Sequence, residues 1–230
     1  MTTPKTSPFQ RNRLIRDAIG RALYDAMRAD SAIYLLGEGC HVKVHYDYPD
    51  IEKDFSDRLL TMPIAEDGSV NFAVGASLLG VKPVVNLITG DFAYRAFDSI
   101  ANTAAKLNFV LPDAEPRRTI VIQAEFLTAG PTTGARPEML FARIPGLSVV
   151  VPSTPWDAYG LMRTALQARE VTLFYEDREI RDEDTLPDDQ LNDGEEFSVP
   201  FGSARHRMNN TRAPRLTIVA YGLMRQVVES

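Results

Sequence analysis

The chain has 230 residues, of which 44% are hydrophobic and 24% charged, and its formal net charge is -6. This composition is typical of a globular protein large enough for one α/β domain, and the negative charge argues against nucleic acid as a partner. No run approaches the roughly 20 apolar residues of a membrane span, and the first residues lack the apolar part of a secretory signal, so we expect no membrane association and a cytoplasmic protein.

The lone cysteine, Cys40, excludes an internal disulfide and a multi-cysteine zinc site. No marked base accompanies it, so we interpret it as a small, partly buried residue and not as a nucleophile. His41 and His45 have the spacing HxxxH but no supporting acid. We therefore predict no metal site in this chain.

The first half of the chain alternates apolar elements with polar segments. Apolar residues four apart predict a helix over 12–29, and "AIYLLG" then predicts a short strand that ends in glycine. Residues 40–57 show no sustained period and are read as a loop with one helical turn, followed by a strand over "RLLTMPI". Asp67 is the predicted N-cap of a helix that runs to about Leu79.

The second half continues the alternation. The further predicted elements are strands over 82–89, 118–125, 147–152 and 171–176, and helices over 95–109, near Met139 and over 154–168. Strands that alternate with helices predict an α/β fold with a mainly parallel sheet covered by helices on both faces.

An acidic run over 176–196 contains eleven acids and two arginines, a local net charge of -9, and leaves +3 for the rest of the chain. Such a run is typical of a solvated connector. We therefore predict a first domain over 1–176, a connector over 177–214, and over 215–230 the beginning of an incomplete further domain. There "RLTIVAYGLM" predicts a buried strand.

Three polar turns are expected at one edge of the sheet. Ligands of open parallel sheets bind beyond the carboxyl ends of the strands. Glu38, Glu66 and the turn 89–92 each follow a predicted strand, which makes them candidates for one site. Read alone, Glu66 is an acid that stabilises a helix N-terminus by ~0.3–1 kcal/mol. Glu38 alone is a turn residue between two glycines, and the chain has no GxGxxG or Walker pattern.

A series of stretches stands in a recognisable order, namely "RDAIGRAL", "LLGE", "MPIAEDG", "FAVGASLLGVKPVV", "AFDSIANTAAK", "IPGLSVVVPSTPWDAYGLMRTAL" and "LFYE". In these stretches the chain resembles the β subunit of the thiamine-diphosphate-dependent E1 component of 2-oxoacid dehydrogenases, of the pyruvate, branched-chain and acetoin types. The resemblance implies a transketolase-like pyrimidine-binding fold for residues 1–176. It also implies that residues 215–230 begin a C-terminal transketolase-like domain.

The resemblance implies roles for four residues. Glu66 is the expected partner of the N1′ nitrogen of the cofactor's aminopyrimidine, and Phe92 is the expected aromatic that stacks on this ring. Ile64 is an expected cofactor-binding neighbour, and Glu38 matches an acid that lines the passage between active sites. A glutamate with this task is expected in apolar surroundings, where its protonated form is easier to reach.

One loop departs from the family pattern. Thr133 stands where the family has a histidine that assists acyl transfer to a lipoyl arm, and the residues around it differ as well. Threonine cannot carry a proton as imidazole does near neutral pH. Arg136 is a candidate to meet an anionic substrate, although an arginine on a loop is more often simply solvated.

The family's diphosphate and magnesium site, a GDG followed by Asn, is absent here and belongs to the α subunit. The resemblance therefore implies an α-type partner, in an α2β2 heterotetramer or similar, and it leaves open a separate C-terminal-domain chain. The expected activity is decarboxylation of a 2-oxo acid with transfer of the resulting fragment. Two alternatives stay open: an acyloin-type, transketolase-like carboligase, and a non-catalytic partner that stabilises or regulates an active homologue.

Overall fold

The computed structural model describes residues 15–38, 49–112, 118–127, 130, 133–178, 180, 196–206 and 216–229. Its elements are α1 (Ile15–Ala29), β1 (Ile33–Gly37), α2 (Pro49–Phe55), η2 (Ser56–Arg58), β2 (Leu59–Thr61), α3 (Glu66–Leu78), β3 (Lys82–Thr89), η3 (Gly90–Tyr94), η4 (Ser99–Ala104), α4 (Leu107–Val110), β4 (Ile120–Phe126), α5 (Glu138–Phe141), β5 (Leu147–Val150), α6 (Pro155–Gln167), β6 (Val171–Asp177) and α7 (Leu223–Glu229).

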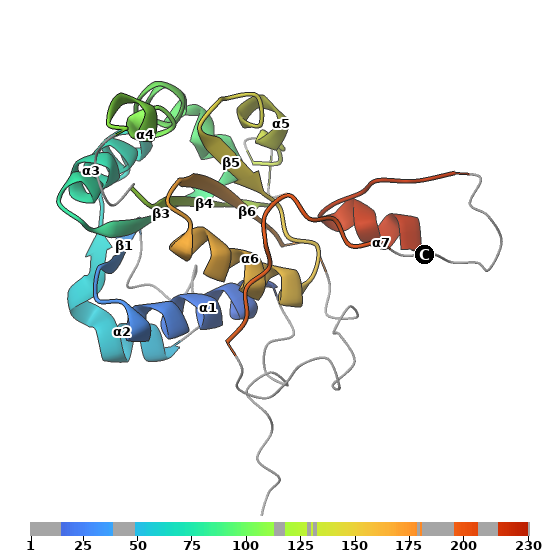
Figure 1. Ribbon diagram of the computed structural model, residues 1–230, viewed down its shortest axis with the longest axis horizontal. Helices are drawn as coiled ribbons and strands as arrows, with labels where there is room; N and C mark the ends of the chain where they lie inside the picture. The colour runs from blue at the N-terminus through green and yellow to red at the C-terminus, as the bar shows by residue number, and fades with distance from the viewer. Residues whose placement is uncertain are drawn as a thin grey trace, which may run out of the picture.

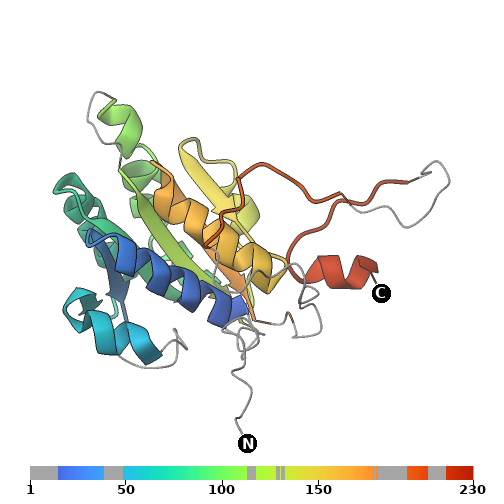
Figure 2. The ribbon, with the colours of Figure 1, turned by 60° about the horizontal axis from the view of Figure 1, so that its bottom comes forward.

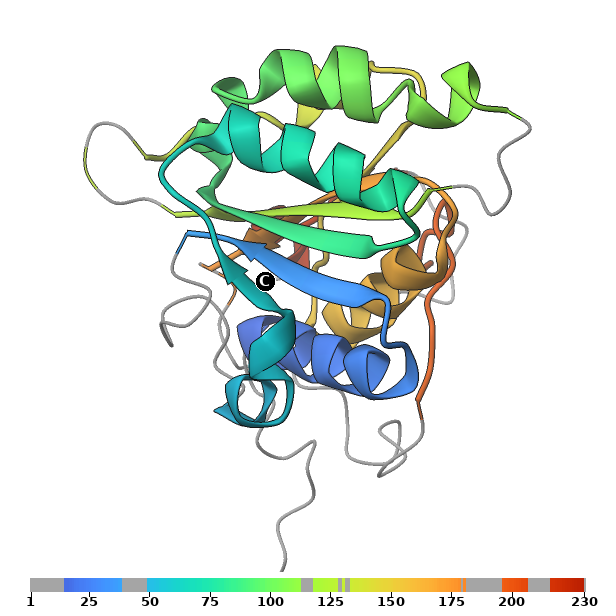
Figure 3. The same ribbon diagram turned by 90° about the vertical axis from the view of Figure 1, so that its left-hand side faces the viewer.

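The described strands form one parallel sheet in the order β2-β1-β3-β4-β6-β5. Helices α1 and α6 pack together on one face, while α3, η4, α4 and α5 cover the other (Figures 1 and 3). Both faces are therefore buried, which explains why the central strands are near-continuous apolar runs. The predicted α/β class with a parallel sheet is confirmed.

Two core clusters lie on the two faces of the sheet. The α1 side contains Leu23, Val121 and Phe174, and the α3 side contains Ile122 and Tyr175, all of them buried. Successive residues of a strand point to opposite faces, so the central strands contribute to both clusters.

The prediction for residues 40–57 was wrong in its second half. Residues 49–55 form α2, a two-turn helix with Ile51 buried and Phe55 packed against Tyr24 of α1 at 5.4 Å between ring centroids. Ile51 and Phe55 are four residues apart, which places both on the face toward α1. Cys40, His41 and His45 lie outside the described residues, and no group of three potential metal ligands occurs in the part that the structure describes.

The strand expected over residues 58–64 is shorter, because β2 is an edge strand that pairs only with β1. The paired register ends where Gly37 meets Thr61, and the chain leaves the sheet after Met62, whose N donates to Gly37 O at 2.9 Å.

The segment predicted as one helix over 95–109 is mostly helical but is not a continuous α-helix, because the π-helix η4 occupies Ser99–Ala104 and the short α4 follows after a turn. Buried Ala96, Ile100 and Ala104 produced the helical period. A period of apolar residues indicates the buried face but not the type of backbone hydrogen bond.

Residues 216–222, predicted as a buried strand, form no strand, and Val219 is 88% exposed. A strand needs a neighbouring strand, and no described residues provide one here. The segment is instead joined to the first domain by Gly222 N, which donates to Ser153 Oγ at 2.9 Å, and by Leu223 N, which donates to Asp177 Oδ2 at 3.2 Å. Helix α7 lies beyond the end of β6, next to the start of α6 (Figure 2).

Candidate functional site

Because the described strands are parallel, their carboxyl ends lie along one rim. Glu38 follows β1, Glu66 begins the helix after β2, and Phe92 lies in η3 directly after β3. The segment with Thr133 and Arg136 follows β4. The structure therefore brings the turns predicted from the sequence to the same edge of the sheet.

Glu66 is the first residue of α3 and points toward the sheet side of that helix. It shares a helix face with Val70, Ala73 and Ser77, at spacings of four, seven and eleven residues, and all three are buried. The Glu66 carboxyl group is half-buried and has no hydrogen-bond or ion-pair partner among the described residues. The carboxyl group thus lies at a helix N-terminus, a place where a ligand can reach it.

The start of α3 is fixed by a polar contact with η4. The prediction that Asp67 is the N-cap of this helix was wrong. Ala65 occupies the N-cap position and makes no side-chain hydrogen bond there. The Asp67 carboxylate instead accepts a hydrogen bond from Ser99 Oγ, which itself accepts from Asn71 Nδ2 at 2.7 Å. This network orients the first turn, and with it Glu66, over the rim.

Exposed apolar side chains lie on α3 and at its two ends in the described part of the chain. Ile64 is 84% exposed, Leu79 is 86% exposed, and Phe72 between them is 48% exposed. Glu66 therefore has buried apolar neighbours on the side toward the sheet, whereas its apolar neighbour on the other side, Ile64, is exposed.

Phe92 is held by an irregular strand end. The pairing of β3 with β4 shifts between Asn86 and Thr89, and Ile88 has a φ of 66°, which is unusual for a β-branched residue. The Asn86 side chain stabilises the bulge because its Oδ1 accepts from Ile88 N at 2.6 Å. The bulge leads directly into η3, where Phe92 is half-buried.

Arg136 does not project freely into solvent. Its guanidinium lies over the ring of Phe126, 4.7 Å from the centroid, and Nη1 donates to Asp177 Oδ2 at 2.9 Å. Asp177 is buried at the end of β6, so this ion pair joins the segment after β4 to the next strand of the sheet. Thr133 is half-buried in the same segment.

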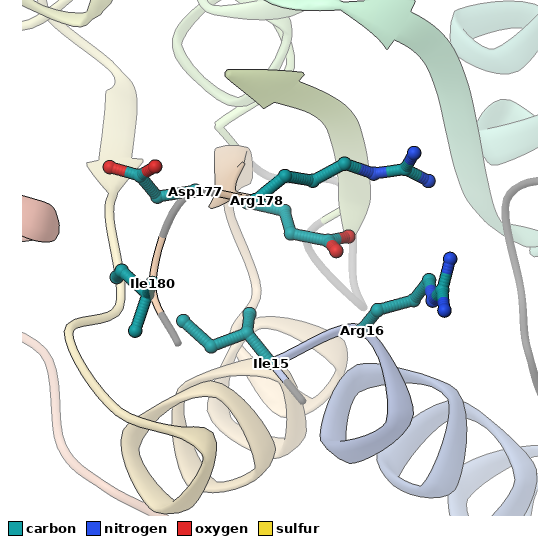
Figure 4. A pocket seen from close by; sticks show the side chains of 6 residues that line it. Ile15, Arg16, Asp177, Arg178 and Ile180 are labelled. Carbon is teal, nitrogen blue, oxygen red and sulfur yellow. The ribbon is translucent and has the colours of Figure 1, made fainter. Parts of the chain in front are cut away.

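A buried acidic pair lies at the rim on the α1 side. Glu125 and Glu176 are neighbours across β4 and β6, and Arg178 Nε pairs with Glu125 Oε2 at 2.7 Å. Burial, reinforced by the charge of Glu125, raises the pKa of Glu176 to about 8. A cavity of about 120 Å³ lies beside Glu176, with Arg16 on its wall (Figure 4).

Several of these rim residues were missed from the sequence, among them Asn86, Glu125, Glu176 and Asp177. Their signal was present, since each is a polar residue inside or directly after an apolar strand, as in "VVNLI" and "LFYED". A buried polar group requires a partner and so points to a site or a structural contact.

These features define the class of protein: an open, parallel α/β domain whose ligand rim carries one acid at a helix N-terminus and one aromatic on the next turn. Residues 12–181 match the family model described as the transketolase, pyrimidine binding domain. The chain belongs to this family. None of the helices in the described part of the chain has the length and hydrophobicity needed to cross a bilayer.

Curated relatives confirm the resemblance to E1 β subunits. The chain is 32% identical to the β subunit of acetoin:2,6-dichlorophenolindophenol oxidoreductase of Cupriavidus necator, over 91% of this chain and 64% of that protein. It is 31% identical to the pyruvate dehydrogenase E1 β subunit of Gracilaria tenuistipitata var. liui, over 94% of this chain and 66% of that protein. It is 29% identical to the 2-oxoisovalerate dehydrogenase β subunit of Bacillus subtilis, over 90% of this chain and 63% of that protein. The chain thus spans somewhat less than two thirds of these relatives.

Solved structures agree on the fold. A split-gene transketolase, an inactive β4 tetramer, superposes with a TM-score of 0.59 at 24% identity, over 72% of this chain and 51% of that chain. The transketolase of Leishmania mexicana superposes with a TM-score of 0.58 at 17% identity, over 72% of this chain and 25% of that chain.

Proposed function

We propose that this chain is the β-type subunit of a heteromeric thiamine-diphosphate-dependent enzyme that decarboxylates a 2-oxo acid and transfers the resulting fragment. The observation that carries the proposal is the position of Glu66. It is a half-buried acid at the N-terminus of α3, without a partner among the described residues, on the rim that also carries Phe92.

The residues present fit the pyrimidine half of the cofactor. Glu66 offers one carboxyl group for a ring nitrogen, Phe92 offers an aromatic face, and Glu38 and Ile64 flank them along the rim. Thiamine diphosphate, when bound, supplies the carbanion chemistry of the reaction. The Glu66 carboxyl group would hold a proton at the position that the ring nitrogen occupies, which is its role in the proposed reaction.

The diphosphate and its Mg²⁺ belong to an α-type partner in this proposal. The described residues contain no group of three acids, histidines or cysteines that would hold a metal ion. Exposed Phe72 on α3, together with Ile64 and Leu79 at its two ends, supports a subunit contact next to Glu66. An α2β2 heterotetramer would bury this surface and close the site across the subunit boundary.

We further infer that residues 216–229 begin a C-terminal domain, in agreement with the greater length of the relatives. Leu216, Ile218 and Val219 are exposed apolar residues that such a domain, in the same chain or in a separate one, would cover. In this division residues 1–176 form the pyrimidine-binding domain and residues 177–214 the connector.

Thr133 supports a specialised relative of the dehydrogenases. Without the imidazole of the family loop, transfer to a lipoyl arm loses its proton carrier, so the fragment passes to another acceptor. Acyloin-type carboligation, in which an aldehyde or ketone accepts the carbanion, is the second candidate that this substitution favours. Arg136 is the cation nearest in sequence to Thr133 for a substrate carboxylate, and its pairing with Asp177 fixes its position.

The test uses the chain together with its candidate α-type partner, thiamine diphosphate and Mg²⁺, and measures 2-oxo acid decarboxylation with an artificial electron acceptor. Glu66→Gln should lower kcat by at least about 100-fold, the scale of losing a general acid. The matched control is Glu52→Gln, an exposed acid in the first turn of α2, which should leave kcat unchanged. Equal activity of Glu66→Gln and wild type would exclude the catalytic role and favour the non-catalytic alternative.

A second variant tests the acceptor. Thr133→His should introduce or increase acyl transfer to a lipoyl domain without a matching increase in decarboxylation. Efficient lipoyl transfer by the wild-type protein would contradict the assignment of another acceptor.

A further inference from the structure

The residue just before Phe92 contacts the segment that departs from the family pattern. Asp91 Oδ2 accepts hydrogen bonds from Gly134 N at 2.9 Å and from Ala135 N at 3.2 Å, and Oδ1 lies 3.4 Å from Ala135 N. One carboxylate thus receives two consecutive backbone N–H groups from a segment more than forty residues away in the sequence. We call residues 133–137 the 133–137 loop.

Close packing accompanies these hydrogen bonds. A Cβ atom built on Gly90 would lie 3.3 Å from Phe126 Cδ1 and 3.3 Å from Pro137 Cδ. The turn after β3 therefore approaches both the end of β4 and the 133–137 loop to within van der Waals distance. A larger side chain at position 90 would push this turn away from the loop.

The far end of the loop is fixed as well. Arg136 pairs with the buried Asp177 and lies over Phe126, and Tyr221 Oη donates to Glu138 Oε1, directly after the loop, at 3.1 Å. Arg136 holds its own end of the loop. Among the described residues, the hydrogen bonds of Asp91 and the packing of Gly90 against Pro137 connect the loop to the turn that carries Phe92.

We propose that Asp91 is a positioning residue: it holds the 133–137 loop in fixed register with the turn that carries Phe92. This inference rests on the proposed function, in which Phe92 faces the cofactor and the loop faces the substrate. Charge-assisted hydrogen bonds from a carboxylate to backbone N–H groups are about twice as strong as neutral ones, so Asp91 is well suited to order a loop. Asp91 thereby sets the distance between the substrate-contacting backbone and the cofactor's aromatic neighbour.

The first experiment measures hydrogen–deuterium exchange of individual amides in the full chain, with or without the partner. Asp91→Ala should accelerate exchange of the Gly134 and Ala135 amides by about tenfold or more, because both lose their acceptor. Asp91→Asn keeps one acceptor oxygen without the charge and should give an intermediate rate. The control is Asp98→Ala, which removes a carboxylate that accepts from exposed Asn102, and both amides should exchange as in wild type.

Unchanged exchange at Gly134 and Ala135 in Asp91→Ala would overturn the proposal, whatever the enzyme activity. If Asp91→Ala does not fold, the Asp91→Asn comparison with wild type gives the same decision. The exchange result does not depend on Glu66, so it separates this inference from a failure of the proposed function.

The second experiment measures kinetics in the reconstituted enzyme. Asp91→Asn should raise KM for the 2-oxo acid by about fivefold or more, with a smaller effect on kcat, since the loop contributes to substrate binding and not to proton transfer. Suppose that Glu66→Gln inactivates the enzyme, as the proposed function requires. If Asp91→Asn then accelerates amide exchange but leaves KM for the 2-oxo acid unchanged, the link between the loop and the substrate is overturned.

Discussion

Replacing Gly37 by Ala should destabilise the protein strongly, because two effects add at this position. Gly37 ends β1 with a φ of +144°, a conformation that L side chains rarely adopt, at a cost of ~1–3 kcal/mol. A Cβ atom there would lie 2.5 Å from the backbone oxygen of Asn86 in β3, which cannot rotate away. Relieving that overlap costs a further ~1–3 kcal/mol. The free energy of unfolding should therefore fall by at least ~3 kcal/mol.

Two other glycines separate these effects in urea unfolding experiments. Gly80 also has a positive φ, +90°, but has no atom within 4 Å of its Cβ position, so Gly80→Ala should lose only ~1–2 kcal/mol. Gly75 lies inside α3 with open space around it, and Gly75→Ala should gain ~0.5–1 kcal/mol from helix propensity. If Gly37→Ala and Gly80→Ala lost the same free energy within roughly 0.5 kcal/mol, the steric argument for the β1–β3 contact would be refuted.

Two further substitutions test other parts of the fold. Burial and Glu125 raise the pKa of Glu176 to about 8 from 4.5, so its stabilising contribution is complete below about pH 4.5 and is lost as the pH rises through 8. Gln at position 176 cannot ionise, so Glu176→Gln should flatten the fall in Tm between about pH 5 and 9. At about pH 9 the free energy of unfolding of the variant should exceed that of wild type by ~1 kcal/mol or more. An unaltered pH profile would contradict the raised pKa of Glu176. Thr154 Oγ1 caps α6 by accepting from Asp157 N at 3.0 Å. Thr154→Ala should therefore lose about 1 kcal/mol in urea unfolding and Thr154→Ser clearly less, whereas equal losses would exclude the cap.

The strands and most helices could be predicted because their signals are local. "VTLFYE" and "KPVVNLIT" are apolar because both faces of the sheet are covered, and this is visible in any short window of sequence. The helix over 95–109 was predicted as one continuous α-helix but contains the π-helix η4, because buried residues four apart, Ala96, Ile100 and Ala104, fit both kinds of helix. The strand expected near Val219 failed because strand formation depends on a partner elsewhere in the chain.

Part of the candidate site was predictable for the same reason. Glu38, Glu66 and Phe92 each directly follow a predicted strand, and parallel strands all end at one rim. The hydrogen bonds of Asp91 and the ion pair of Arg136 with Asp177 were not predictable, since each joins segments more than forty residues apart.

The sequence by itself determined the alternation of elements, the parallel sheet and the edge at which the acids and Phe92 lie, because burial and chain direction are encoded in local patterns. Only the tertiary structure decided the strand order, in which β6 separates β4 from β5 and so places Glu176 beside Glu125. It also decided the bulge before Phe92 and the attachment of the 133–137 loop to Asp91. These features depend on the register between distant segments, which is set by the packing of the whole domain and not by any single stretch of residues.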